Sequence, residues 1–546
     1  MARHARQRVP RTLLIGAIAL AVALAGALVT VALVRRDRAV DRLAQTQCGV
    51  TLGVVTASSY LPVLDAVAGG LATGPQCVRL DVRPIDGRPA AASIPEIHAD
   101  LWIPDDPGWS RTAAAAAANL AKPIPGGAGT VLATSPIYLV SDAGTASKVT
   151  GQGGGWRGLA GLAASGGVHL ALSDPAGSGD GLLAAGALGE AVWNDGGMDA
   201  SAEALSAAVR VTRTVRTGDP VLPPRPGEVA LVAERTLVPV LSTVRRDNLT
   251  ITAPADRTAA LRYTFLPTAA AVADPALGGG LDRLLRALSG AQADRGLAAA
   301  GLRRPGKGPP EGAPAGLPPV SAPLFDVLAA HHNDHDFATW HAADRRGDVL
   351  IAVDVSGSMA DPAPATGRPL INLVGDSIGE LAELLPDDGR LGLWEFGSKL
   401  DANTDYRVLV SPDDLDQRHR AAIAAAVAQL RARPTGTGLH DTILAAYLAA
   451  RDGARPGVPS HALVFTDGRN EDDEPSLTLP QLTEQLAHAA DPGRPVRLTV
   501  ITFGAAPDVA ALAAGLQPVR GFVDPVSTAG QVRAAFLHAA AGGLPE

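Results

Sequence analysis

Lysine is nearly absent from this chain of 546 residues, because only four of its 47 Lys and Arg residues are lysines. Asp and Glu number 55, so the net charge of −8 gives no basic footprint and disfavours nucleic acid as a partner. The arginine preference, with abundant alanine, glycine and proline, indicates a high-GC bacterium. Aromatic residues are only 3% of the chain, so each tryptophan in a loop is either a ligand contact or ordinary packing.

The motifs of common enzyme classes are also missing. The sequence has no G-x-S-x-G elbow, no Walker loop and no H-E-x-x-H helix. In the polar loops described below the one histidine is His440. The sequence therefore predicts a binding protein with no catalytic residue, not an enzyme.

A long uncharged run lies near the start of the chain. Residues 12–34 contain no charged side chain and would extend about 35 Å as a helix, enough for a hydrocarbon core of roughly 30 Å. The apolar region of a cleavable signal is only about 7–15 residues long, so we expect an uncleaved signal anchor. Arginines flank the run on both sides, so the positive-inside rule does not decide its orientation. We assign residues 1–11 to the cytoplasm and residues 35–47 to a stem.

Cysteine occurs only twice, at Cys48 and Cys77, outside any C-x-x-C or metal-binding spacing. Each stands near the start of a candidate strand, and the sulfurs meet if the two strands are parallel neighbours. A disulfide just beyond a membrane span favours an oxidising exterior. Two buried free thiols are the alternative. The prediction is a single-pass protein of the cell membrane with most of the chain outside.

Three polar loops, each following an apolar run or opening a helical one, predict a metal site. A short β-branched run ends in Asp354-Val355-Ser356-Gly357-Ser358, Thr437 lies in a glycine-rich turn, and Asp467 ends another apolar run. Ligand crevices of open α/β sheets lie at the carboxyl ends of their strands. Hard oxygen ligands suit Mg²⁺ or Mn²⁺ rather than zinc. The alternative is three unrelated polar turns.

This D-x-S-x-S, T, D order resembles the metal-ion-dependent adhesion site of von Willebrand factor type A domains, and every position matches. The resemblance implies a doubly wound, Rossmann-like domain over residues 346–546. It implies that Ser356, Ser358 and Thr437 contact Mg²⁺ (or Mn²⁺ or Ca²⁺), and that Asp354 and Asp467 hold it directly or through water. A partner protein's Asp or Glu carboxylate would complete the coordination.

Before this region the chain alternates short apolar runs with alanine-rich helical stretches, which indicates an α/β fold with mostly parallel strands. A Pro/Gly-dense stretch then predicts a linker, which with its lead-in covers residues 306–345. The strands expected before it are 50–55, 78–82, 99–103, 130–133, 137–140, 168–172 and 229–232. Those expected after it are 349–353, 391–396, 462–466 and 496–502.

Residues 48–305 resemble a two-lobed, type 2 periplasmic solute-binding domain in their pattern and order. The resemblance rests on Thr56–Tyr60, Ala99–Trp109, Thr134–Tyr138, where such folds cross between lobes, and Ser173–Gly179. The return crossing is expected near Glu234–Thr236.

Helix starts in this region predict a solute site, because free N–H groups at a helix N-terminus favour an oxyanion or carboxylate. Ordinary helix capping is the alternative for Ser58 and Ser178. Trp102 and Trp109 contact either a ligand or the neighbouring lobe. The candidate solute residues are Ser58, Ser59, Trp102, Asp105, Ser135, Ser178 and Gly179.

Two further clusters have plainer interpretations. The histidines at 331, 332, 335 and 341 border the linker in no defined zinc spacing, so they predict a solvated loop. The acidic run Glu471–Glu474 predicts a charged surface loop, with Ca²⁺ binding as the alternative.

The order of segments resembles membrane-anchored bacterial proteins, particularly of actinobacteria, that join a substrate-binding domain to a von Willebrand factor type A domain. The resemblance implies extracytoplasmic recognition of a partner protein through the cation. The alternatives are a solute receptor whose A domain relays binding, a receptor for an ABC importer, and a chelatase-like assembly factor.

Overall fold

The structure is a computed structural model that describes residues 48–540 apart from short internal gaps. The gaps are residues 75, 95–96, 98, 121–128, 194–201, 242, 244–248, 311, 314–315, 325–346, 365, 402–403, 469, 472–475 and 505–508. The predicted span at 12–34, its flanks, the histidine cluster and most of the acidic run lie outside the described residues. Within the described ranges, no helix is both long and apolar enough to cross a membrane.

Contacts divide the chain into two units. The first unit consists of the chain up to Ser135 together with Arg262–Ala313. The second unit consists of Pro136–Leu261 together with the chain from Pro314 onward. The crossing into the second unit falls inside β4 (Thr130–Ser141), within the predicted Thr134–Tyr138 segment. The return falls inside β9 (Ala260–Pro267), so its prediction near Glu234 is wrong. Glu234 is buried and accepts from the Tyr138 hydroxyl, which fixes it in the second unit.

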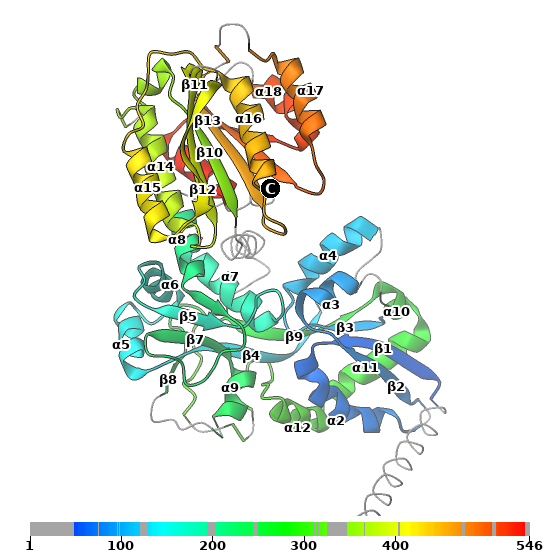
Figure 1. The fold of residues 1–546 in the computed structure, drawn as a ribbon. Helices are drawn as coiled ribbons and strands as arrows, with labels where there is room; N and C mark the ends of the chain where they lie inside the picture. The colour runs from blue at the N-terminus through cyan, green and yellow to red at the C-terminus, as the bar shows by residue number, and fades with distance from the viewer. Residues whose placement is uncertain are drawn as a thin grey trace, which may run out of the picture. The chain divides into compact units, whose positions relative to one another are not determined.

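The first unit is a sheet with helices packed on it. Strands β2, β1 and β3 are parallel, and β9 pairs antiparallel with β3 (Figure 1). Its elements are β1 (Val50–Thr56), η1 (Ser58–Tyr60), α2 (Leu61–Leu71), β2 (Val78–Pro84), α3 (Gly87–Ser93), β3 (Leu101–Ile103), α4 (Trp109–Leu120), α10 (Ala269–Ala273), α11 (Pro275–Leu288) and α12 (Ala291–Ala299).

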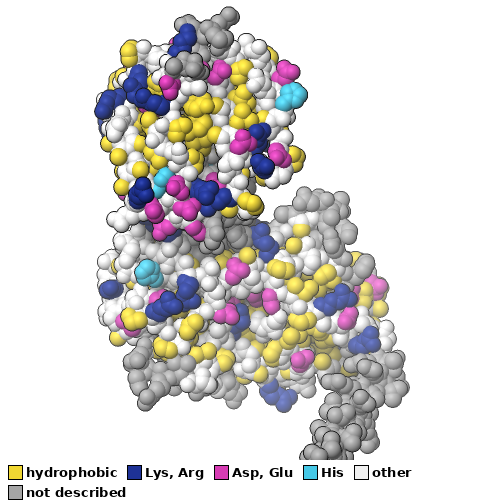
Figure 2. Space-filling view, in the orientation of Figure 1, with side chains coloured by type: hydrophobic (Ala, Val, Ile, Leu, Met, Phe, Trp, Pro, Cys, Tyr) yellow, Lys and Arg dark blue, Asp and Glu magenta, His cyan; other side chains and the backbone are white. Residues whose placement is uncertain are grey.

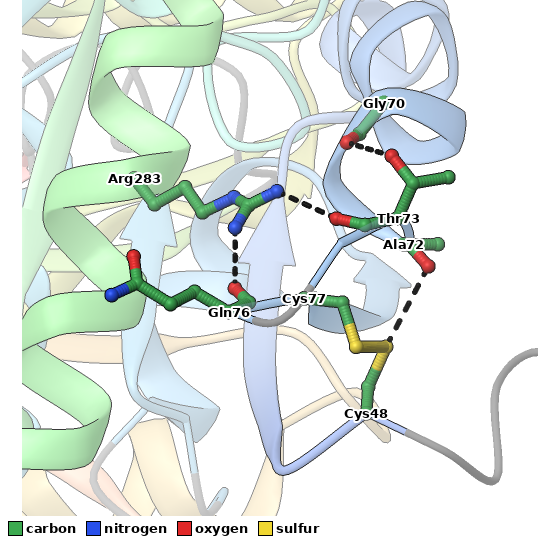
Figure 3. Close-up of a disulfide and its surroundings, with 7 residues drawn as sticks. All are labelled: Cys48, Gly70, Ala72, Thr73, Gln76, Cys77 and Arg283. Atoms are coloured by element: carbon green, nitrogen blue, oxygen red, sulfur yellow. Dashed lines mark hydrogen bonds between the residues drawn. A yellow bond between two sulfur atoms is a disulfide. The ribbon is translucent and has the colours of Figure 1, made fainter.

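The two cysteines form a disulfide, as predicted from the parallel pairing of β1 and β2. Val50 is in register with Val78, and the Cys48 and Cys77 Cα atoms lie 5.2 Å apart. Arg283 of α11 donates to the carbonyls of Gln76 and Thr73, at 2.6 and 2.8 Å, and so fixes the turn before Cys77 (Figure 3). The free-thiol alternative is wrong.

In the part of the second unit up to residue 261, β4 pairs antiparallel with β7 and β8, while β7, β5 and β6 are parallel. The two strands predicted at 130–133 and 137–140 are one, because the chain stays extended through Pro136. The elements are α5 (Ala143–Gly151), α6 (Trp156–Ala164), β5 (His169–Leu172), α7 (Gly179–Trp193), α8 (Ala202–Arg213), β6 (Val215–Thr217), β7 (Glu228–Ala233), α9 (Glu234–Val240) and β8 (Thr250–Thr252).

From Asp348 the chain forms a six-stranded sheet in the order β12-β11-β10-β13-β14-β15, parallel except for β12. Helices cover both faces, as predicted for a doubly wound fold, with α14 and α19 packed on one face and α16 and α17 on the other (Figure 1). The elements are β10 (Asp348–Asp354), η3 (Gly357–Ala360), α14 (Leu370–Leu384), β11 (Arg390–Asp401), β12 (Thr404–Asp414), α15 (Gln417–Val427), α16 (Leu439–Asp452), β13 (Ser460–Thr466), α17 (Leu479–Ala489), β14 (Val496–Phe503), α18 (Val509–Gly515), η4 (Gln517–Val519), β15 (Phe522–Val526) and α19 (Ala529–Ala540).

Strand β12 was missed in the sequence. It contains Pro412, which lowers the expectation of a strand and is tolerated only because β12 is at the edge of the sheet. Gly392 of β11 lies opposite, where an added Cβ would be 2.6 Å from Pro412 Cγ. The pair of strands therefore needs a glycine at that position.

Candidate functional site

The candidate metal residues lie at the point where the strand order of the six-stranded sheet reverses. The chain leaves β10 to one side to form β11 and later returns to the other side to form β13. Asp354 is the last residue of β10, and Asp467 follows β13 directly. The connections that follow these two neighbouring strands run to opposite sides of the sheet. Between them lies the crevice where ligands of open α/β sheets bind.

A chain of hydrogen bonds joins four of the five predicted residues. Asp354 Oδ1 accepts from the Ser356 N–H at 2.7 Å, and the Ser356 and Ser358 hydroxyls lie 3.2 Å apart. The Ser358 hydroxyl donates to Asp467 Oδ1 at 2.9 Å. Two carboxylates from different strands are thus linked by the two serines of the D-x-S-x-S segment.

Thr437 belongs to the same cluster through its backbone and its side chain. It is buried, and it exchanges two backbone hydrogen bonds with Glu471, at 2.9 and 3.0 Å. A Cβ placed on Gly468 would lie 3.7 Å from Thr437 Oγ1, so this hydroxyl lies beside the residue after Asp467. The structure therefore brings together all five residues that the sequence predicted.

Thr466 is part of the site and was missed by the sequence reading. Its hydroxyl donates to Asp354 Oδ2 at 2.6 Å, and it is fully buried. Both oxygens of Asp354 therefore accept a hydrogen bond, one from each neighbouring segment. The signal was available, since Thr466 directly precedes Asp467 at the end of a strand.

The charges around the two carboxylates are of one sign. Burial raises the pKa of Asp354 to about 6, the hydrogen bonds from Thr466 and Ser356 lower it, and the charge of Asp467 raises it. Burial also raises the pKa of Asp467, with Asp361 and Glu471 adding to the effect. A cation would relieve this repulsion.

The donor set fits a small, hard divalent ion. Two carboxylates and three hydroxyls offer only oxygen, which Mg²⁺, Mn²⁺ and Ca²⁺ prefer. Within the described residues no group of three or more His, Cys, Asp or Glu side chains is placed to hold a metal. A group of that kind would hold a metal by carboxylate, thiolate and imidazole ligands alone. The present cluster has only two carboxylates, and its other oxygen atoms come from serine and threonine.

The predicted solute residues of the first unit are mostly engaged within the chain. The Ser58 N–H donates to Asp86 Oδ1 at 2.8 Å and its hydroxyl to Asp86 Oδ2 at 2.5 Å. The Ser58 amide is therefore not free for a solute anion, contrary to the prediction. The Ser59 hydroxyl lies 2.7 Å from the Tyr263 hydroxyl, and Asp105 Oδ1 accepts from Trp109 Nε1 at 2.9 Å.

The remaining solute candidates lie in strands or at a helix start. Ser135 is fully buried in β4. The Ser178 hydroxyl accepts from the Gly181 N–H at 3.2 Å, which is an ordinary cap of α7, and Gly179 is the first residue of that helix. The alternative interpretation of Ser178 is therefore the one observed. Solute binding by this set stays a prediction.

In the first unit, the buried atoms Tyr60 Oη, Trp102 Nε1 and Asp106 Oδ2 have no hydrogen-bond partner in the described part of the chain. Asp106 is fully buried, its other oxygen accepts from the Gly108 N–H at 2.7 Å, and burial raises its pKa to about 7. An unpaired buried polar atom costs about 1–3 kcal/mol. Tyr60 and Asp106 were not among the predicted residues.

Two family models match the chain. Residues 348–513 match the von Willebrand factor type A domain, and residues 52–303 match the bacterial extracellular solute-binding protein family. The chain therefore carries a bacterial solute-binding domain followed by a von Willebrand factor type A domain. A comparison with curated proteins gives no match.

Solved structures resemble the two parts separately. A von Willebrand factor type A protein from Catenulispora acidiphila is 21% identical with a TM-score of 0.30, over 36% of this chain and 42% of its own length. A periplasmic thiamin-binding protein is 15% identical with a TM-score of 0.37, over 54% of this chain and 96% of its own. The sulfate-binding protein of Mycobacterium tuberculosis is 16% identical with a TM-score of 0.31, over 47% and 87%.

Proposed function

We propose that this chain is a membrane-anchored, extracytoplasmic binding protein whose A domain recognises a partner protein through a divalent cation. Residues 12–34 supply the anchor. The cation is Mg²⁺, or Mn²⁺ or Ca²⁺, and its ligands are Asp354, Ser356, Ser358, Thr437 and Asp467. The observation that carries the proposal is the series of hydrogen bonds from Asp354 through two serines to Asp467. It joins two carboxylates that come from adjoining strands.

The arrangement favours a site that is completed from outside. Asp354, Ser356 and Thr437 are buried, while Ser358 is exposed and Asp467 half-buried, so the cluster opens to solvent on one side. Asp354 and Asp467 would balance the charge of a bound Mg²⁺, and together with the three neutral hydroxyls they supply five oxygen ligands, which leaves one position of an octahedron open. A carboxylate of a partner protein is the oxygen ligand that such an ion attracts most strongly.

The metal site is tested by calorimetric titration of Mg²⁺ and Mn²⁺. Asp354→Asn removes one ligand charge at constant shape and is expected to abolish binding, with the near-ultraviolet circular dichroism retained. Asp361→Asn is the matched control, because Asp361 is an exposed carboxylate that acts on Asp467 without belonging to the motif. Equal Mg²⁺ affinity in wild type and Asp354→Asn would refute the assignment.

Partner recognition and location need separate tests. Cross-linking pull-down from the source cells, with and without EDTA, is expected to capture a protein only when the cation is present. Protease treatment of intact cells is expected to release the part of the chain after residue 47. Complete protection from the protease would show that the domains are not outside.

A second function, solute reception by the first domain, is favoured by the unpaired buried atoms Tyr60 Oη, Trp102 Nε1 and Asp106 Oδ2. The ionised carboxylate of Asp106 can only accept hydrogen bonds, so a solute that meets its unpaired oxygen in that state would carry an N–H or O–H group. A thermal-shift panel of amines, amino acids, sugars and oxyanions tests this candidate. Stabilisation that survives Asp106→Asn unchanged would exclude the role of Asp106, and no stabilisation by any of the four classes would exclude the function for those solutes.

A further inference from the structure

A cavity of about 620 Å³ lies on the A domain between edge strand β12 and helix α15. Its side walls are apolar and come from Leu409 and Val410 of β12 and from Ala422, Ala425 and Ala426 of α15. One end is formed by Glu395, Arg407 and Arg433. Pockets for small molecules have volumes of roughly 300–1,000 Å³, so the cavity is of that size.

The charged end of the cavity has more donors than acceptors. Glu395 is nearly fully buried and accepts from both Arg407 and Arg433, the latter at 3.1 and 3.4 Å. Arg433 Nε is buried and without a partner among the described residues. Two guanidinium groups therefore share one carboxylate, which leaves a positive charge. Asp413, the other lining carboxylate, is exposed and about 20 Å from Arg407 along β12, because a strand rises roughly 3.3 Å per residue.

The same end of the cavity is connected to the metal cluster through the backbone. The Arg433 N–H donates to Val355 O at 2.7 Å, and Val355 lies between Asp354 and Ser356. Two residues further on, Thr435 O accepts from the Gly357 N–H at 3.3 Å. Arg433 therefore holds the turn that leads to Thr437 against the D-x-S-x-S segment, while its side chain faces the cavity.

We propose that this cavity is a second ligand site of the A domain, which binds a small amphipathic carboxylic acid. The carboxylate pairs with Arg407 and Arg433, and the apolar part lies along Leu409 and Ala425. Ligand binding draws Arg433 away from Glu395 and so changes the affinity of the metal site, by an equal factor in both directions. The coupling rests on the proposed metal function, and the binding does not.

Binding is tested on the full-length chain in EDTA, by calorimetric titration of 4-phenylbutyrate and of its uncharged analogue 4-phenylbutanamide. Saturable binding of the acid is expected, with at least about a tenfold loss for the amide and for Arg407→Gln. Arg407→Gln leaves Glu395 paired with Arg433 alone. Ala425→Phe fills the cavity from an exposed position and is expected to abolish binding, which keeps the test decisive if Arg407→Gln does not fold.

Three outcomes would overturn the site: no saturable binding to wild type, equal binding of acid and amide, or full binding to Ala425→Phe. The coupling is tested by titrating Mg²⁺ with and without saturating 4-phenylbutyrate. A changed Mg²⁺ affinity is expected, and an unchanged affinity would refute the coupling. Acid binding to a chain that takes up no Mg²⁺ would leave this site standing and overturn the proposed metal function instead.

Discussion

The substitution Thr466→Val tests whether the hydroxyl of Thr466 positions the Asp354 carboxylate in the metal cluster. Thr466 is fully buried, and its hydroxyl donates to Asp354 Oδ2 at 2.6 Å. Valine has nearly the same shape, so the substitution removes the donor without opening a cavity. Thr466 acts on the cation through its neighbours, since it donates to Asp354 and also accepts from the Gly468 N–H at 3.2 Å. It is therefore a positioning residue, and its loss is expected to weaken Mg²⁺ binding without abolishing it.

The magnitude follows from the state of Asp354. A hydrogen bond to a charged group contributes about 1.5–3 kcal/mol. At pH 7 the carboxyl, with a pKa of about 6, is mostly ionised, and protonating it costs about 1.4 kcal/mol. The variant can take up this proton to relieve the unsatisfied charge, which limits the loss of stability. Mg²⁺ needs the ionised form, so its affinity is expected to fall about 10–100-fold, as for other residues that orient metal ligands.

Thr502→Val is the matched control. Thr502 is the register partner of Thr466 on the neighbouring strand β14, and it is equally buried, but its hydroxyl has no hydrogen-bond partner among the described residues. Its replacement is expected to leave Mg²⁺ affinity unchanged and stability unchanged or higher. Calorimetry and urea unfolding at pH 7 measure both quantities. Equal results for the two variants would show that the hydroxyl of Thr466 does not support Asp354.

Three further predictions follow from single features of the structure. Replacing Cys48 and Cys77 by serine is expected to destabilise the first unit by about 3.6 kcal/mol in the chain-entropy model, since the disulfide spans 29 residues, and thermal unfolding of oxidised wild type and variant measures the loss. Asp106→Asn is expected to raise the thermal midpoint at pH 8 and not at pH 4. Because the pKa of Asp106 is raised to about 7 in the folded state, the stability of the wild type falls as the pH rises from about 4 to 7. An effect of the substitution that does not depend on pH would contradict this. Mg²⁺ at 100 times its Kd is expected to stabilise the A domain by about 2.7 kcal/mol, and the same stabilisation in Asp354→Asn would refute specific binding.

The metal cluster could be predicted because its ligands follow apolar runs that are recognisable by themselves. Asp354 ends one buried strand and Asp467 directly follows another, each strand has an apolar middle, and parallel strands bring their carboxyl ends to one edge. The order of residue types along the chain was then enough to identify the cluster. The pairing of Cys48 with Cys77 was predictable for the same reason, since two parallel neighbours start side by side.

The cavity beside Arg433 could not be predicted from the sequence. One wall is β12, whose exposed, charged residues and Pro412 give no continuous apolar run. The contact of Arg433 with Glu395 joins residues 38 positions apart, and nothing in their spacing indicates it. Such a site depends on helix α15 packing back on edge strand β12, and only the folded chain shows which side chains meet there.

The first domain shows the limit of arguing from helix starts. Ser58 does stand at the beginning of a helical segment, and its N–H does bind a carboxylate, but that carboxylate is Asp86 of the same chain. The physical preference was correct, and the anion that meets it in this structure is a side chain of the same chain, because a local rule cannot tell a solute from a side chain that the fold brings to the same place. Asp106 is the opposite case. No local rule selected it, yet it is fully buried with one unpaired oxygen, and leaving a buried polar atom unpaired costs free energy that a ligand's hydrogen bond would recover. For this domain, the unpaired acceptor is therefore a better basis for the proposed solute site than the helix starts are.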